Sequence, residues 1–181
     1  MLTQDDVINL LEYDIDTGIF VWRRRSESHF KSTRAGRTWN TRYSGSKAGT
    51  LRKSARRVTP YSAIMLNGKS HYAHRLAWLY VFGVMPEKQL DHIDGNGLNN
   101  AISNLRIVTQ SENSRNSRRS SKNTTGVTGV YYDQSSDKWM AFIGIGGKSS
   151  KKLGRFSSFE DAVMARSDAE KKYGYHSNHG R

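Results

Sequence analysis

The stretch LDHIDGNGLNNAISNLRIVTQSEN, from Leu90 to Asn113, decides the fold of the central part of this chain. Its pattern predicts a strand, a turn, a second strand and the start of a helix. The sequence DGNG at 94–97 is a double turn signal, and NLRIVT at 104–109 is a short run typical of a strand. Thr109 and Glu112 stand three residues apart, which is the capping-box spacing that begins a helix.

Acidic, imidazole and amide side chains gather in this stretch. Asp91 and His92 are adjacent at the end of an apolar segment, and Asn113 falls in the first turn of the predicted helix. We therefore expect the hairpin and the helix to bring these three side chains to one point. Asn104 is expected to brace the turn through amide hydrogen bonds to backbone groups.

These residue types suit hydrolysis of a phosphodiester. A neutral imidazole accepts a proton near pH 7, so His92 is the candidate general base. Asp91 and Asn113 offer oxygen ligands for a divalent cation, which would hold the phosphate and the leaving oxygen. The plainer alternatives are a hydrogen-bonded surface pair and an ordinary asparagine-rich turn. A calcium loop counted from Asp94 fails, because its twelfth position is Leu105 rather than glutamate.

Composition restricts the function further. The 181 residues contain no cysteine, which excludes disulfides and thiolate metal sites and favours Mg²⁺ or Mn²⁺ over zinc. The formal net charge is +13 and the pI is about 10.1, and each third of the chain is basic. Such a charge predicts association with a long polyanion, DNA above all. The chain has no apolar run long enough for a membrane span and no secretory signal, so we expect a cytoplasmic protein.

The flanking segments predict small elements. Residues 2–12 read as a helix with Thr3 as N-cap, and YDIDTGIFVW at 13–22 reads as a hairpin. Residues 23–57 are polar and basic, and we expect either a mobile loop or an arm that orders on a partner. A hairpin turning at Asn67-Gly68 and a helix from His74 to Val81, ending at Gly83, should follow.

The C-terminal part has a different pattern. Residues 114–125 contain no apolar side chain and read as a basic linker, which is either a solvated tether or an arm along a DNA groove. Three short strands are then predicted from Gly126, followed by an amphipathic helix over 158–173 that Ser158 and Asp161 begin. The predicted fold class is α+β, with a C-terminal three-stranded antiparallel sheet plus helix.

The residues from His74 to Asn116 resemble the HNH homing endonucleases of phages and their introns, of the kind that lacks cysteine. The blocks HRLAW, DHIDGNGLNN, NLRIVT and ENSRN carry this resemblance in order and spacing. It implies a central ββα-metal (His-Me finger) nuclease core, with Asp91 and Asn113 binding one divalent metal ion. It also implies that His92 is the general base and that Asn104 holds the hairpin loop and orients that base. His74 and Asn116 match recurring positions whose roles stay open.

Residues 126–175 resemble the DNA-binding domain of plant ethylene-response factors, whose sheet lies in the major groove. KWMAFI and LGRFSSFEDAVMARSDA carry the resemblance. That family tends to use sheet arginines where this chain has Tyr131 and Gly144. The resemblance therefore implies the fold of this domain but not the DNA sequence that it recognises. The candidates for DNA contact along the chain are basic or aromatic: Arg23, Arg24, Arg25, Arg56, Arg57, Arg115, Arg118, Arg119, Lys138, Trp139, Lys151, Lys152 and Arg155.

The sequence as a whole predicts a modular DNA endonuclease that nicks one strand of double-stranded DNA and acts as a monomer. We expect a DNA-gripping region at 1–73, the nuclease core at 74–117, a basic linker at 118–125 and a DNA-binding domain at 126–181. The alternative is a catalytically inactive DNA-binding protein of the same architecture, although its site would be expected to have lost at least one of the four residues. An RNA-binding module is a third interpretation, which the lack of aromatic RNA-platform motifs disfavours.

Overall fold

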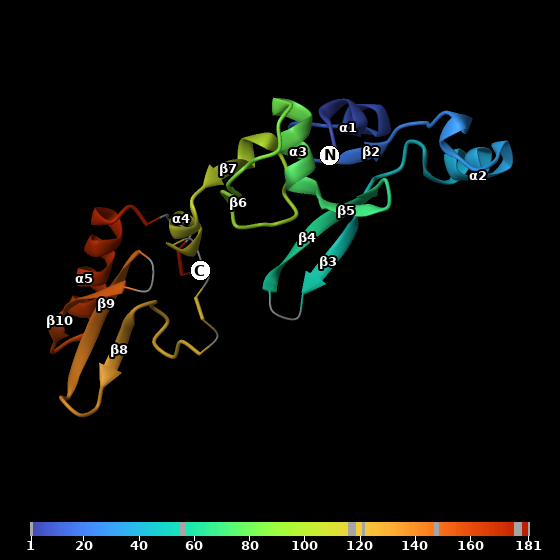
Figure 1. The fold of residues 1–181 in the computed structure, drawn as a ribbon. Coiled ribbons are helices and arrows are strands. Elements are labelled where there is room, and N and C mark those ends of the chain that lie inside the picture. Colours follow the sequence, from blue (N-terminus) through green and yellow to red (C-terminus); the bar gives the residue numbers. More distant parts are fainter. Residues whose placement is uncertain are drawn as a thin grey trace. The chain divides into compact units, whose positions relative to one another are not determined.

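The structure is a computed structural model that describes residues 2–54, 57–115, 119–120, 122–146, 149–175 and 179–180. The side chains at 53, 54, 57, 58, 111, 114 and 115 are also outside this description. The chain divides into two compact units, Met1–Ile107 and Val108–Arg181 (Figure 1). Both units mix helices with small antiparallel sheets, so the predicted α+β class is confirmed. The predicted four regions are finer than these units and stay a prediction.

The first unit begins with a capped helix and a hairpin. Helix α1 (Gln4–Leu10) starts at Thr3, whose hydroxyl accepts a hydrogen bond from the Asp6 N–H while the Asp6 carboxylate accepts one from the Thr3 N–H. This reciprocal pair satisfies two helix-end donors, and it confirms the predicted N-cap at Thr3. Strands β1 (Leu11–Tyr13) and β2 (Phe20–Trp22) then pair antiparallel around the turn that contains Gly18.

Residues 27–54 contain two helices and a strand, so the predicted mobile loop or arm is wrong for this part of the 23–57 stretch, while residues 55 and 56 lie outside the described residues. A short 3-10 helix η1 (Glu27–His29) precedes helix α2 (Thr33–Tyr43), which Ser32 caps through the Ala35 N–H. Strand β3 (Thr50–Ser54) follows and pairs with β4 (Arg57–Leu66). Aromatic rings and cations, not an aliphatic stripe, hold α2 in place, which explains why the hydrophobic pattern does not reveal this helix.

A sheet and a buried helix complete this part of the unit. Strand β4 also pairs with β5 (Lys69–Tyr72) across the predicted turn, where Asn67 and Gly68 both have positive φ. Helix α3 (Ala73–Phe82) follows directly and ends at Gly83, which adopts the left-handed conformation. Both features match the sequence prediction, because a type I′ turn and a left-handed helix end favour Asn-Gly and Gly.

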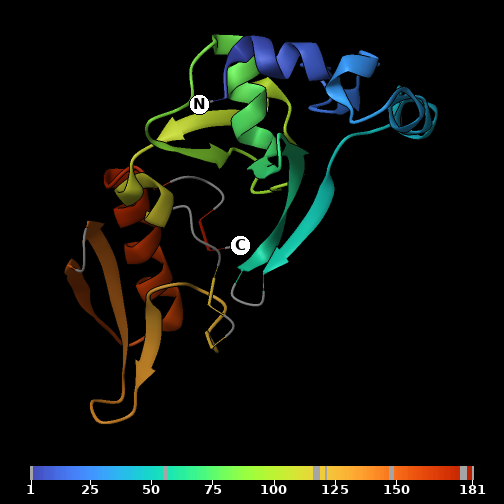
Figure 2. The ribbon, with the colours of Figure 1, turned by 45° about the vertical axis from the view of Figure 1, so that its right-hand side comes forward.

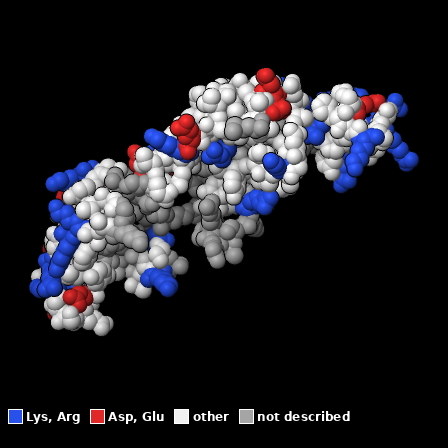
Figure 3. Space-filling model, viewed as in Figure 1, with Lys and Arg blue, Asp and Glu red and all other residues white. Residues whose placement is uncertain are grey.

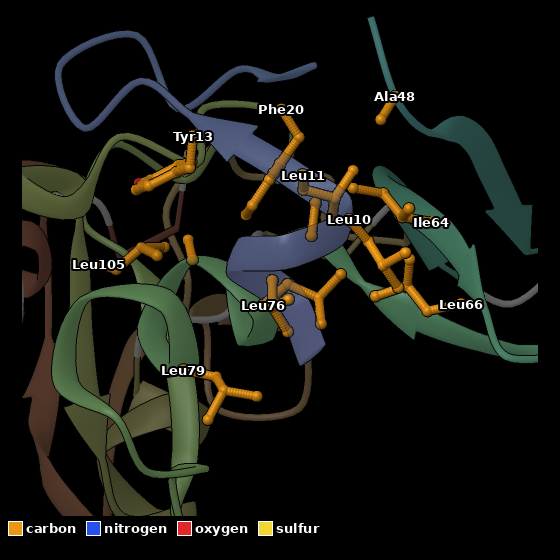
Figure 4. Packing of buried hydrophobic residues seen from close by; sticks show 13 residues of the cluster. Leu10, Leu11, Tyr13, Phe20, Ala48, Ile64, Leu66, Leu76, Leu79 and Leu105 are labelled. Carbon is orange, nitrogen blue, oxygen red and sulfur yellow. The ribbon is translucent and has the colours of Figure 1, made fainter. Parts of the chain in front are cut away.

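One hydrophobic core holds the first unit together. It includes Val7 and Leu11 from the N-terminus, Ile64 from β4, Leu76 from α3 and Leu105, which begins strand β7 (Leu105–Val108) (Figure 4). Residues on both sides of position 73, the predicted boundary between the first two regions, therefore contribute to the same core. Burial of these side chains fixes the backbone on which the central stretch is mounted.

The central stretch forms a two-stranded sheet. Strand β6 (Gln89–His92) pairs with β7, and the 3-10 helix η2 (Ile102–Asn104) precedes β7. Helix α4 (Gln110–Arg115) follows, and Thr109 and Glu112 form the predicted capping box. The order strand, strand, helix is the predicted one, while the metal-binding core stays a prediction.

The second unit has a three-stranded antiparallel sheet, ordered β10 (Ser149–Phe156), β9 (Lys138–Gly146) and β8 (Val130–Asp133). Helix α5 (Phe159–Lys172) runs along one face of this sheet, as Figure 2 shows. Ser158 caps α5, and Val130, Ala141 and Ala162 form the centre of the core. In the described residues, no helix is long and apolar enough to cross a membrane.

Candidate active site

The β6–β7 hairpin places the Asp91-His92 pair at the end of a strand. Asp91 is partly buried, and its carboxylate atom Oδ2 accepts two hydrogen bonds from Arg106, 2.8 Å from Nη2 and 3.1 Å from Nε. His92 is 6% exposed. The carboxylate is thus held by a cation on the paired strand, and the imidazole lies in the interior.

Burial determines the protonation state of His92. Removal from water lowers its pKa from the ordinary histidine value, and the hydrogen bond to Asn100 and the charges of Asp94 and Asp91 only partly oppose this effect. His92 is therefore neutral at pH 7. A neutral imidazole in contact with a substrate is ready to accept a proton.

One hydrogen bond also determines which ring nitrogen carries the proton. Nε2 of His92 lies 3.3 Å from Oδ1 of Asn100, and the Asn100 amide nitrogen donates to the Leu98 carbonyl at 3.2 Å. The amide is thereby oriented with its oxygen toward the ring. Because that oxygen can only accept, Nε2 carries the hydrogen and Nδ1 is the proton-accepting atom.

Asn100 is held by the N-terminal hairpin. Its backbone carbonyl accepts a 2.7 Å hydrogen bond from the Tyr13 hydroxyl, and the residue is 3% exposed. A Cβ atom placed on Gly18 would lie 2.2 Å from the Asn100 carbonyl carbon and from the Ala101 nitrogen. The absence of a side chain at Gly18 thus allows the two segments to touch.

Asn104 braces the loop that joins the strands. Its Oδ1 accepts from the Asp94 N–H at 3.0 Å, and its Nδ2 donates to Asp94 Oδ1 at 3.0 Å and to the Asn99 carbonyl at 2.8 Å. Although burial opposes the effect, hydrogen bonds from Asn96, Asn99 and Asn104 lower the pKa of Asp94. The predicted bracing of the loop is confirmed, and the catalytic role of Asn104 stays a prediction.

Tyr61 and a second histidine, His74, pack against His92. The ring centroid of His74 lies 5.2 Å from that of His92, and Tyr61 lies 5.8 Å from it. Burial, together with His92 and Arg75, lowers the pKa of His74 to about 3. Nδ1 of His74 is buried and makes no hydrogen bond to the described residues. His74 is therefore a neutral, packed ring on the wall of the site.

The predicted metal ligands lie in different units. Asp91 belongs to the first unit, and Asn113 lies in α4 of the second, where its N–H donates to the Thr109 carbonyl at 3.0 Å. Their convergence stays a prediction. No cluster of three His, Asp or Glu side chains capable of holding a metal occurs within the described part of the chain. The donor set, one carboxylate and one amide, fits a hard cation that keeps several waters, as Mg²⁺ does.

The predicted DNA contacts fall into different environments. Arg23 and Arg24 are exposed, whereas Arg25 lies over the rings of Trp22 and Trp39, and burial lowers its pKa. Trp139 packs against Phe159 in the core of the second unit. Among the predicted contacts in that unit, Arg119, Lys151, Lys152 and Arg155 are exposed, and the Lys138 ammonium donates to Ser157. Arg56, Arg118 and Asn116 lie outside the described residues, as do the side chains of Arg57 and Arg115.

Sequence reasoning did not identify Asn100 and Arg106 as parts of this site. Asn100 stands in an asparagine pair that reads as turn residues, and Arg106 stands within the predicted strand NLRIVT. The one available signal for Arg106 is its place opposite Asp91 on a paired strand, where opposite charges attract. Nothing local marks Asn100, because its role depends on contact with Tyr13, 87 residues away.

Comparison with known protein families identifies the family that the segment around the β6–β7 hairpin resembles. Residues 71–115 match the family model described as HNH endonuclease. The match covers strands β6 and β7 and the whole of α4, and it supports an HNH nuclease domain that acts on DNA. None of the curated proteins and none of the solved structures compared with the chain matches it. The phage or intron type and the likeness of residues 126–175 to ethylene-response factors therefore stay predictions.

Proposed function

We propose that this chain is a metal-dependent DNA endonuclease that hydrolyses phosphodiester bonds and nicks one strand of double-stranded DNA. The observation that carries this proposal is the buried, neutral His92 with its Nε2 proton directed to Asn100, within a segment that matches HNH endonucleases. An imidazole held in one tautomer has a defined proton-accepting atom. One such site per chain favours nicking over a double-strand break.

Each residue of the site has a separate role in the proposed hydrolysis. His92 Nδ1 takes the proton of the attacking water, Asn100 orients the ring, and Asn104 keeps the loop in place. Asp91 and Asn113 would hold a divalent cation, Mg²⁺ or Mn²⁺, and when bound this ion supplies charge stabilisation for the phosphate and the leaving oxygen. Arg106 orients the Asp91 carboxylate through its two hydrogen bonds.

The experiment incubates supercoiled plasmid and phage DNA with the wild type, His92→Ala and His29→Ala, in Mg²⁺, Mn²⁺ or chelator. His29 is an exposed histidine of the same unit and serves as the matched control. We expect metal-dependent nicking by the wild type and by His29→Ala, none by His92→Ala, and nearly equal DNA affinity for all three. A large loss of affinity in His92→Ala would contradict its role as base.

The second candidate is a DNA-binding protein without catalysis, which the net charge of +13 also favours. Retarded but uncut DNA with every ion, on phage and plasmid DNA alike, would put this candidate first. Linear product without a nicked intermediate would instead contradict the single-strand part of the proposal.

A further inference from the structure

The first unit contains a long stretch without acidic residues. Residues 28–86 include eleven Lys and Arg and no Asp or Glu. The preceding acid, Glu27, already pairs with Arg37 at 3.3 Å. In Figure 3, Lys and Arg side chains crowd the lobe formed by α2. A polyanion is the partner that such an uncompensated surface selects.

Helix α2 is not held in place by an aliphatic face. Its buried residues are Gly36 and Asn40, and the Asn40 amide bonds the backbone N–H and carbonyl of Arg25. Trp39 contacts Phe30 and Trp22, and the Arg25 guanidinium lies 4.2 Å from the Trp39 ring centre. These contacts fix the backbone of α2 and leave most of its side chains exposed.

A depression of about 470 Å³ opens along one stripe of this helix, and we name it the α2 pocket. The rings of Trp39 and Tyr43, whose centroids are 5.3 Å apart, line it together with Arg34 and Arg42. Arg34 and Arg42 are eight residues apart, which is about 12 Å along a helix axis. The small side chains of Ser32, Ala35 and Thr38 complete the lining and keep the depression open.

We propose that the α2 pocket binds one strand of DNA, with phosphates on Arg34 and Arg42 and an unpaired nucleoside resting on Tyr43 and Trp39. The inference rests on the proposed function only in that DNA is the substrate. Guanidinium groups bind phosphate through charge and directed N–H donors. Aromatic side chains stack on nucleobases whatever the sequence. Because neighbouring base pairs cover the base faces within a duplex, the rings select a nucleotide that is not paired.

The test uses the full chain and labelled oligonucleotides, one single-stranded and one a blunt duplex, titrated by fluorescence anisotropy over several salt concentrations. The variants are Arg34→Gln, Arg42→Gln and Arg37→Gln. Arg37 lies on the same helix but outside the pocket, so its substitution removes the same charge without removing a lining residue. We expect the pocket variants to weaken single-strand binding about threefold to tenfold and to reduce the salt slope by about 0.7 each. Arg37→Gln should change both much less.

The stacking part is tested with Tyr43→Leu and Tyr43→Phe. We expect Tyr43→Leu to weaken single-strand binding about fivefold or more, and the duplex less, because base stacking contributes at least about that factor. Tyr43→Phe keeps the ring and should retain the wild-type affinity. Far-ultraviolet circular dichroism and the melting temperature check that each variant is folded.

Each result has a defined meaning. Pocket variants that bind single strands no more weakly than Arg37→Gln would overturn the proposal, as would equal affinities for Tyr43→Leu and Tyr43→Phe. If the pocket variants weakened duplex binding as much as single-strand binding, the proposal that the bound nucleoside is unpaired would be overturned. If the proposed nuclease function were wrong, the chain would bind DNA without nicking it. The binding test of the α2 pocket does not depend on nicking and would still apply.

Discussion

At the scale of single residues, the His92–Asn100 hydrogen bond makes a direct prediction. Asn100→Ala removes the acceptor that fixes the ring tautomer, and a neutral hydrogen bond is worth about 1 kcal/mol. We expect both tautomers of His92 to become populated and single-turnover cleavage at saturating DNA to slow about threefold to tenfold. Nitrogen NMR of the imidazole reports the tautomer without reference to activity.

The matched control for this prediction is Asn96→Ala. Asn96→Ala removes another loop amide, one that caps the Leu98 N–H, and should leave the tautomer unchanged. A single Nε2–H tautomer in Asn100→Ala would show that Asn100 does not determine it.

The second prediction at this scale concerns His74. Its pKa is about 3 in the folded chain and near 6.5 when unfolded. The unfolded chain therefore binds a proton between these values that the folded chain does not, so the free energy of unfolding falls as pH drops from 6.5 toward 3. The contribution is at most about 1.4 kcal/mol per pH unit. Urea denaturation from pH 7 to 4 should give a flatter slope for His74→Phe than for the wild type.

His29→Phe is the control for this pH dependence, since His29 is exposed in the same unit. Its slope should equal that of the wild type. If His74→Phe and His29→Phe lost stability equally with falling pH, His74 would have to be protonated in the folded chain.

At the scale of elements, the close approach of the β1–β2 turn to the loop before β7 predicts a costly substitution. Gly18 has φ +70°, and an added Cβ would meet backbone atoms of Asn100 and Ala101 at 2.2 Å. We expect Gly18→Ala to lower the free energy of unfolding by about 2–4 kcal/mol. Gly45→Ala, at φ +78° with no atom within 4 Å of the added Cβ, should cost about 1 kcal/mol. Equal costs in urea denaturation would mean that the two segments can separate.

The elements also show how far the sequence alone could predict the fold. Thr3, Thr109, Ser158 and Gly83 end or begin their helices as predicted, because capping depends on residues within one turn of the chain. Helix α2 was missed because its stability comes from ring and cation contacts with segments outside it. The part Asn100 plays was missed for the same reason: the Tyr13 hydroxyl that holds it is distant in sequence.

At the scale of the whole molecule, the two units have separate cores. The first core draws on residues from Val7 to Leu105, and the second on residues from Val127 to Ala162. Among the described side chains, neither core includes one from the other unit. Removal of one unit should therefore leave the apolar packing of the other intact.

This separation predicts the effect of deleting residues 126–181. We expect the shortened chain, which keeps the HNH segment and α4, to nick plasmid DNA at a similar rate but at more numerous positions, because the exposed cations on β10 are gone. Mapping of nick positions on phage DNA measures how strictly the cleavage site is selected. The melting temperature of the first unit should stay within a few degrees of its value in the full chain. The combined substitution of Lys151→Gln, Lys152→Gln and Arg155→Gln in the full chain is the control, since it removes the exposed cations of β10 and keeps the fold. Unchanged selection in the shortened chain would place recognition in the first unit, where the α2 pocket is the next surface to test.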